Sequence, residues 1–425
     1  MKFLTRRLKK EYYPFTQLSH PAQQLVKSIL AYNLIHPIFV LFINAFLWRQ
    51  SQDIQLVSLY NLAFYVFLPV GFHLNGLLWK HSLLSHARSY TLGGVSKSIA
   101  VFLLIFSTHF DIYNVFILGG LFGLCSGIYF GTRNFLSLKV TESNNRLYFS
   151  SLELVSNTIT NIIVPLLVGA FIVYGTTSHR YTPIQAYYVV AMILVVISII
   201  SGWQIRAIKL PLPKIKKIML HHPSRHWLQC RAVMMMFGLM QGTFQFLSVL
   251  MILSFIGNEG ALGMVQAVSA ILASIVLYGV ARKVPPEKRL WIIGSSVALL
   301  IVGGLSFEMW QSAIGVFLFM TFYALAQPLL WMGINSLNLD VIDKETVKAH
   351  NDYSYLFDSE LFLNIGRIIG VIIFLFYSSL FSSDLAMKMT PLLFGLAQII
   401  LLFIARSSQH KQRQAELADI QLADH

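Results

Sequence analysis

Residues 134–140 read Asn-Phe-Leu-Ser-Leu-Lys-Val, and residues 335–341 read Asn-Ser-Leu-Asn-Leu-Asp-Val. The two segments share Asn at the first position, Leu at the third and fifth, and Val at the seventh. Each segment closes a long apolar run and leads through a polar connection into another apolar run. Matching polar residues at matching places predict an internal duplication.

The apolar runs that follow these segments begin with the same pair of polar residues. One run begins with Glu153 and Asn157, and the other begins with Glu360 and Asn364. Residues four apart lie on one face of a helix, so each pair projects in a single direction. The duplication therefore extends over two consecutive helices in each copy.

The composition of the chain indicates that lipid surrounds it. Apolar residues make up 56% of the 425 positions and charged residues only 12%, whereas soluble proteins carry roughly 25% charged residues. The apolar residues fall into runs of about 17 to 25, long enough to cross a hydrocarbon core as helices. We therefore predict an all-α polytopic membrane protein.

Twelve runs are predicted to be transmembrane helices, joined mostly by short loops. The one long interruption, 206–229, contains six Lys and Arg residues and divides the chain near its midpoint. The predicted helices are 22–48, 56–79, 91–107, 115–136, 149–173, 186–205, 230–256, 261–280, 289–306, 313–337, 354–380 and 387–405.

These helices define the predicted domains. Six helices precede the basic interruption and six follow it. The predicted units are a lead-in at 1–21, a six-helix bundle at 22–205, a linker at 206–229, a second six-helix bundle at 230–405 and a tail at 406–425.

The distribution of positive charge predicts the orientation in the membrane. Of the 32 Lys and Arg residues, 25 fall on the side of the two termini and the basic linker, and three fall on the other side. Cytoplasmic loops are enriched in Lys and Arg, so both termini and the linker should be cytoplasmic. The net charge of +14 is then explained by topology, and we expect no binding of nucleic acid.

The repeat and the topology together resemble a known family. The copies lie six helices apart, and because six is even, both cross the membrane in the same direction. A parallel six-plus-six arrangement with cytoplasmic termini and a basic central loop resembles the major facilitator superfamily of secondary transporters. That family usually marks the loop after its second helix with Gly-x-x-x-Asp. Here Gly76 is followed by Lys80 at the aspartate position, which leaves the subfamily open.

Four ionisable residues in or near the predicted helices are candidates for function. A charge in hydrocarbon costs about 2.5–3.5 kcal/mol or more, so it tends to face a bundle interior or a wet cavity. Arg367 lies in the middle of its helix, seven residues after Glu360 on the same face. Glu153 lies about one turn inside its helix, and Arg133 lies one turn from the end of the preceding helix.

Two interpretations of these residues are open. In the first, Glu360 and Arg367 line a central cavity, where Glu360 exchanges protons and Arg367 binds an anionic group bidentately. In the second, Glu360 and the Glu153–Arg133 pair are latches that hold helices in one conformation. We favour the latch for Glu153 and the cavity for Arg367, and leave Glu360 open between the two.

Further polar and aromatic residues recur at mid-depth on the first, fourth, seventh and tenth predicted helices. The resemblance implies that these four helices line the cavity. A buried glutamine can instead bond a neighbouring helix, and a lone histidine can be a packing residue. The candidate set is His36, Tyr129, Gln241, Gln245, Tyr323, Gln327 and Trp331, with Asn364 added beside Glu360.

Two features of the glycine and proline residues complete the prediction. Gly119, Gly123, Gly127 and Gly131 recur every four residues, a spacing that favours close helix packing in lipid. The segment Val164-Pro165-Leu-Leu-Val168-Gly169 half-resembles the Gly-Pro-x-x-Gly-Gly segment of the superfamily's proton-driven exporters, with Pro165 and Gly169 retained and two glycines absent. This partial match favours export over import.

The sequence thus predicts a secondary active transporter for a small organic solute, anionic or zwitterionic, coupled to protons. We expect a monomer in the cytoplasmic (inner) membrane of a bacterium, with no cofactor, no metal and no enzymatic activity. No phosphate-binding glycine loop with Lys-Ser or Lys-Thr is present in the sequence, which argues against ATP-driven transport. The alternative is a transporter-like sensor or assembly factor that moves nothing.

Overall fold

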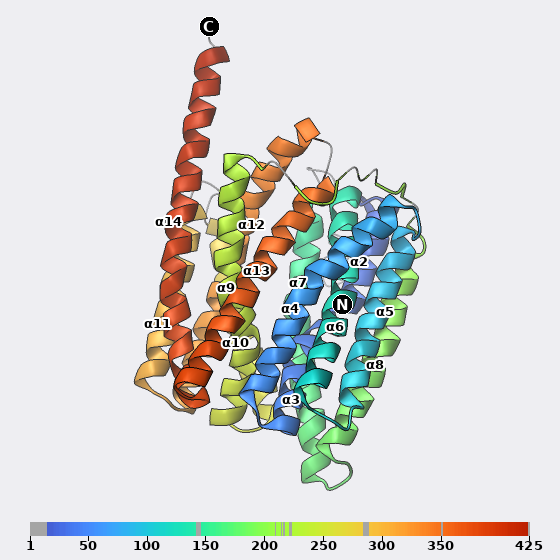
Figure 1. Cartoon of the computed structure of the whole chain (residues 1–425), viewed down its shortest axis with the longest axis vertical. Coiled ribbons are helices and arrows are strands. Elements are labelled where there is room, and N and C mark those ends of the chain that lie inside the picture. The colour runs from blue at the N-terminus through green and yellow to red at the C-terminus, as the bar shows by residue number, and fades with distance from the viewer. Residues whose placement is uncertain are drawn as a thin grey trace, which may run out of the picture.

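The chain folds as a bundle of long helices (Figure 1), and no strand occurs in the residues that the structure describes. The structure is a computed structural model. It describes residues 15–141, 146–208, 210–213, 215, 217–220, 223–283, 289–349 and 352–423. The helices are α2 (His20–Asn33), η1 (Ile38–Phe42), α3 (Ile43–Ser51), α4 (Ile54–Lys80), α5 (His86–Ile105), α6 (Ile112–Val140), α7 (Arg146–Thr177), α8 (Pro183–Ile205), α9 (Arg225–Phe255), α10 (Glu259–Lys283), α11 (Arg289–Met309), α12 (Ala313–Ala349), α13 (Asp352–Leu380) and α14 (Ser383–Ala423).

The structure has a helical segment at each of the twelve predicted places. Eleven of them are long and apolar enough to span a membrane. The remaining crossing is α5, which packs beside α6 and α8 within the bundle. Its apolar character is diluted by His86, Arg88 and Lys97. It begins one turn before the predicted start because the Ser85 hydroxyl accepts a hydrogen bond from the Arg88 amide, which caps the helix.

The first crossing consists of three pieces, α2, η1 and α3, where one helix was predicted. Pro37 explains the break, because proline has no amide hydrogen and its ring collides with the carbonyl four residues earlier. The chain continues as the π-helix η1, directly after Pro37, and then as α3. Single π-turns inside membrane helices occur frequently at functional sites.

The outside of the bundle is apolar and its inside contains polar residues. Ile117, Leu167, Ile275 and Phe403 are each more than 60% exposed. Asn44, Asn61, Asn75, Asn364 and Gln398 are buried. This inverts the pattern of a soluble protein and matches a bundle whose outer face contacts lipid.

In the N-terminal half, α6 lies against α4 along the predicted glycine ladder. Cβ atoms added at Gly119, Gly123 and Gly127 would lie 2.5, 2.3 and 2.0 Å from carbonyl oxygens of α4. Only glycine permits such an approach, so the packing role predicted for the ladder is confirmed at these three positions.

In the C-terminal half, the tight pair is α9 with α13. Cβ atoms added at Gly238 and Gly366 would lie 2.1 and 1.9 Å from carbonyl oxygens of the partner helix. At Gly242 an added Cβ would lie 2.6 Å from the Cα atom of Arg367. The glycines of α9 therefore allow the backbone of α13 at Arg367 to lie directly against α9.

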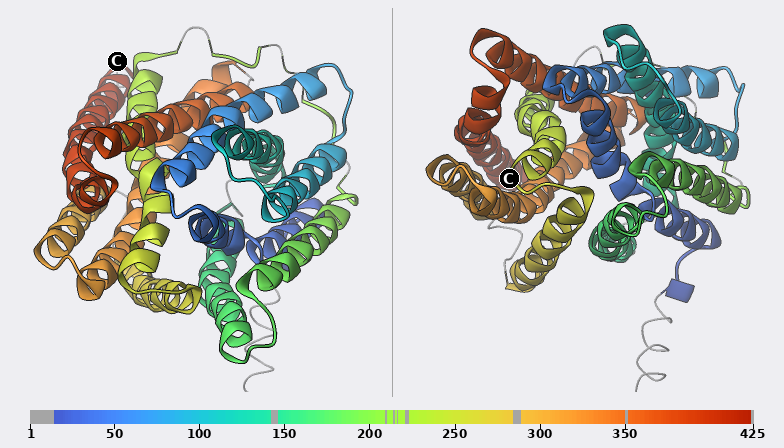
Figure 2. Two further views of the ribbon diagram at one scale, coloured as in Figure 1. Left: turned by 60° about the horizontal axis from the view of Figure 1, so that its bottom comes forward. Right: turned by 90° about the horizontal axis from the view of Figure 1, so that it is seen from below.

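The two halves meet along two helix pairs. In Figure 2, α2–α8 lie on one side and α9–α14 on the other. The halves join where α7 packs on α10 and where α4 packs on α13. Counting crossings, these pairs are the fifth with the eighth and the second with the eleventh. A shift of six crossings converts one pair into the other, as a parallel six-plus-six repeat requires.

Candidate functional site

Arg367 is the centre of a polar cluster near the middle of α13. Its Nε and Nη2 atoms donate to Gln241 Oε1 on α9 at 3.0 and 2.7 Å. Its Nη1 atom donates to Asn364 Oδ1 at 3.0 Å and lies 3.5 Å from Glu360 Oε1. The Arg367 side chain is 12% exposed and that of Glu360 is 17% exposed. The structure thus brings together four predicted residues.

The Glu360 carboxylate is held from two directions. Asn364 Nδ2 donates to Glu360 Oε1 at 2.9 Å, and the Arg367 guanidinium approaches the same oxygen. The i, i+4 spacing of Glu360 and Asn364 allows the amide contact, as the shared helix face predicted. The face of α13 toward α9 therefore holds a carboxylate, an amide and a fixed cation in one row.

The N-terminal half reaches this cluster through Tyr65 of α4. The Arg367 guanidinium carbon lies 5.4 Å from the centre of the Tyr65 ring, within the range of a cation–π interaction. The Tyr65 hydroxyl donates to Gln245 Oε1 at 2.9 Å and lies 3.2 Å from the Gly242 carbonyl oxygen. The cluster is therefore positioned between the halves, where a rocking motion would alter it. Tyr65 was missed by the sequence prediction, which considered other helices.

Glu153 and Arg133 form an ion pair, as the latch interpretation predicted. The pair joins α6 to α7 within the N-terminal half. Their side chains are 31% and 16% exposed. The structure establishes the contact, and its role as a latch stays a prediction.

The remaining predicted residues of the C-terminal half lie outside the hydrogen bonds of the Arg367 cluster. Tyr323 packs against Phe244, with ring centres 5.4 Å apart. Trp331 packs against Phe237 at 5.5 Å and is 37% exposed. Gln327 is half-buried. Their part in binding stays a prediction.

Two predicted residues of the N-terminal half lie near a second buried cation. The Tyr129 ring stacks on Tyr32 with centres 4.4 Å apart, and its hydroxyl is 2.9 Å from that of Tyr90. The His36 ring lies 5.9 Å from the Tyr32 ring. Tyr32 of α2 thus contacts both predicted residues, and Tyr129 also reaches α5.

The second cation is Lys97 of α5, which is 2% exposed. Its Nζ atom donates to the Tyr32 hydroxyl at 2.7 Å. It lies 4.4, 4.8 and 5.1 Å from the ring centres of Phe39, Phe130 and Phe122. The sequence prediction did not name Lys97 as a candidate, although a lysine in the middle of a transmembrane helix was the signal that could have found it.

A further polar contact joins the two halves at one end of the bundle. Arg49 Nε and Nη2 donate to the two carboxylate oxygens of Glu259 at 2.7 and 2.6 Å. The Tyr187 hydroxyl donates to Glu259 Oε1 at 3.2 Å. The Glu259 side chain is 1% exposed. Sequence reasoning missed this pair.

The opposite end of the bundle has a weaker bridge between the halves. Lys139 at the end of α6 lies 2.5 Å from Asp352 at the start of α13. These side chains are 44% and 23% exposed.

Within the described part of the chain, no group of three or more His, Cys, Asp or Glu residues is arranged to hold a metal ion.

Comparisons with known proteins define the class of fold. No family model matches the chain. The chain is 22% identical to the uncharacterized protein YqgE of Bacillus subtilis (strain 168) over 380 residues, covering 88% of this chain and 86% of that protein.

Solved structures give the same architecture. A solved structure that concerns substrate recognition in proton-dependent oligopeptide transporters is similar to this chain, with a TM-score of 0.67 and 13% sequence identity. The similarity covers 93% of this chain and all of that one. The nucleoside transporter NupG matches with a TM-score of 0.60 at 13% identity, covering 92% of this chain and 99% of that one. The chain is therefore a multi-pass membrane protein with the fold of these transporters, which is the architecture that the sequence predicted.

Proposed function

We propose that this protein is a secondary active transporter that moves a small organic anion or zwitterion by alternating access. The observation that supports the proposal best is the Arg367–Glu360–Gln241 cluster, which faces Tyr65 of the other half. A fixed guanidinium beside a carboxylate offers one group for an acidic end and one for an amino end of a solute. The similar structures are of transporters, which agrees with the proposal.

Alternating access needs contacts between the halves that can break at each end in turn. Arg49–Glu259 and Lys139–Asp352 bridge the halves at opposite ends of the bundle. Both pairs are formed in this structure, so opening toward either side of the membrane would release the pair at that end. This arrangement supports a transporter over the alternative, a sensor or assembly factor that does not switch.

We further propose coupling to protons through Glu360, with Glu153 as the second choice and export as the favoured direction. Glu360 lies in the cluster that a solute would contact, whereas Glu153 is paired with Arg133 inside one half. The Bacillus relative supports a bacterial origin, and the basic loops support a cytoplasmic position of both termini.

Transport in proteoliposomes under an imposed pH gradient tests the proposal. The probes are labelled dialanine as a zwitterion, benzoate as an anion and uridine as a neutral solute. We expect gradient-driven flux of dialanine or benzoate but not of uridine, and a loss of about tenfold or more in Glu360→Gln.

Glu153→Gln is the matched comparison, because it neutralises the equivalent carboxylate of the other repeat, which is our second choice for the coupling site. We expect it to retain gradient-driven flux. Intact coupling in Glu360→Gln would show that this carboxylate is not the coupling site. Absence of flux for every probe, together with accessibility that never switches sides, would favour the protein that moves nothing.

A further inference from the structure

The Lys97 ammonium has more donors than the protein satisfies. An ammonium group has three N–H donors, and Lys97 uses one of them on the Tyr32 hydroxyl. The other contacts of its Nζ atom are with aromatic ring faces. Among the described residues, no Asp or Glu forms an ion pair with Lys97. A buried cation without an anion is costly, so a retained one points to a ligand.

Two further polar atoms, in segments that supply these aromatic rings, are buried without a hydrogen-bond partner. They are Nδ1 of His36 and Oγ of Ser126. His36 lies beside Tyr32, and Ser126 lies between Phe122 and Tyr129 on α6, at helical spacings of four and three residues. Buried polar atoms are rarely left unpaired, so these two also point to a missing partner.

All of these groups can donate to the same kind of partner. The ammonium and the serine hydroxyl are donors, and histidine donates from Nδ1 in one of its tautomers. The next charged group on this face of α6 is Arg133, another cation, whose own partner is Glu153. A ligand group that accepts several hydrogen bonds and carries negative charge would complete the set.

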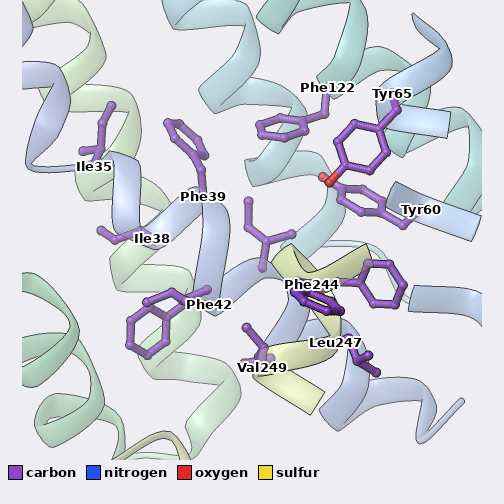
Figure 3. Packing of buried hydrophobic residues seen from close by; sticks show 14 of the residues in the cluster. Ile35, Ile38, Phe39, Phe42, Tyr60, Tyr65, Phe122, Phe244, Leu247 and Val249 are labelled. Atoms are coloured by element: carbon purple, nitrogen blue, oxygen red, sulfur yellow. The ribbon is translucent and has the colours of Figure 1, made fainter. Parts of the chain in front are cut away.

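The surroundings also predict the rest of the ligand. Phe122, which faces Lys97, lies 5.0 Å from Phe64, and Phe64 lies 5.0 Å from Tyr65. Tyr65 in turn lies over Arg367. Figure 3 shows Phe39, Phe122 and Tyr65 in the same region of the interior, contributed by three segments. A continuous series of aromatic rings thus runs from one buried cation to the other.

We propose that Lys97, with Tyr32, His36 and Ser126, binds the acidic group of an organic anion whose aromatic or other apolar body lies along Phe39 and Phe122. The inference rests on the proposed function in taking this ligand to be the transported solute. It adds to that function a binding site in the N-terminal half and a ligand class, the aromatic carboxylates. The second cation, Arg367, lies at the far end of the ring series.

Equilibrium binding to the purified protein in lipid nanodiscs tests the inference. Benzoate is the probe and benzamide is its neutral counterpart of the same shape. Binding is followed by the shift in thermal unfolding temperature and by tryptophan fluorescence. The variant is Lys97→Met, and the matched control is Lys27→Met, which removes the same charge from an exposed position of α2.

We expect benzoate to raise the unfolding temperature of the wild type and of Lys27→Met, and benzamide to leave both unchanged. In Lys97→Met the affinity for benzoate should fall by about tenfold or more, while the unfolding temperature without ligand should not fall. A residue that served only to pack the rings would give the opposite result, a lower unfolding temperature. If Lys97→Met does not fold, Tyr32→Phe should still weaken benzoate binding.

Equal responses to benzoate and benzamide, equal affinity in Lys97→Met and wild type, or no benzoate response at all would overturn the inference. The test needs no flux, so its failure can be told apart from failure of the proposed function. Benzoate bound through Lys97 but never moved would refute transport alone. Dialanine flux that is neither inhibited by benzoate nor reduced by Lys97→Met would refute this site alone.

Discussion

The two halves of the molecule bury a cation near mid-membrane in different ways. In the C-terminal half, Arg367 has a carboxylate and two amides as partners. In the N-terminal half, Lys97 has one hydroxyl and several ring faces. A cation whose partners are built into the fold can stabilise it, whereas one without an anion is stabilised fully only when a ligand arrives. We therefore expect Arg367 to stabilise the fold in addition to its proposed contact with the solute, and Lys97 to contribute to binding without stabilising the fold.

The repeat makes the same contrast visible at equivalent positions. Glu153 corresponds to Glu360, and seven residues later Thr160 corresponds to Arg367. The N-terminal copy therefore lacks the cation on its own helix, and Glu153 takes Arg133 of α6 as its partner. The same sequence pattern thus forms an ion pair within one helix in the C-terminal half and between two helices in the N-terminal half.

The largest expected effect is a difference in the free energy of unfolding between variants of the two buried cations. Arg367→Met should lower the free energy of unfolding by about 3 kcal/mol, because it leaves the Glu360 carboxylate buried without a cation. Lys97→Met should be neutral or stabilising, because it replaces an unpaired charge by an apolar side chain among rings. Thermal and denaturant unfolding in detergent measures both. Equal losses in the two variants would remove the contrast between the halves.

A smaller loss of stability is expected when one of two glycines in the N-terminal half is replaced by alanine. Gly127→Ala should cost about 1–3 kcal/mol, because the new Cβ would lie 2.0 Å from the Leu68 carbonyl oxygen and force α6 away from α4. Gly94→Ala is the control, since its Cβ would lie 3.4 Å from the nearest side-chain atom, in Tyr129. Unfolding midpoints of the two variants should differ clearly. A tolerated alanine at Gly127 would contradict the close packing of this half.

The smallest expected effect concerns the ion pairs at the two ends. Glu259→Gln should favour opening at its end by about 1 kcal/mol, a value between those of exposed and buried pairs, because the Arg49 side chain is 37% exposed. The measurement is the rate of alkylation of a cysteine introduced as Val249→Cys, near the C-terminal end of α9 and therefore toward the Glu259 end of the bundle. The two native cysteines, Cys125 and Cys230, are replaced by Ala in this protein.

The matched control for this measurement is Lys139→Met, which removes the exposed pair at the opposite end. We expect faster alkylation at position 249 in Glu259→Gln only. Faster alkylation in both variants would show that the two pairs do not act on opposite ends.

Sequence reasoning reached the C-terminal cluster but not the N-terminal one. Glu360, Asn364 and Arg367 share one helix, so their common face followed from spacing alone. Lys97 was passed over because its partners lie on α2, η1 and α6, and no periodicity within α5 indicates aromatic rings on other segments. Tyr65 and Glu259 were missed for the same reason, since each acquires its meaning from a contact across the halves.

The sequence by itself determined that the chain crosses a membrane twelve times and is built from two copies, because segment length, hydropathy and repeated residues are local properties. Only the tertiary structure decided which buried charges have partners. Whether Lys97 lies among aromatic rings, and whether Arg367 reaches Gln241 and Tyr65, depends on how closely α4, α5, α6, α9 and α13 approach one another. That approach is governed by glycines whose neighbours lie far away in the chain, so it emerges only when the helices are packed.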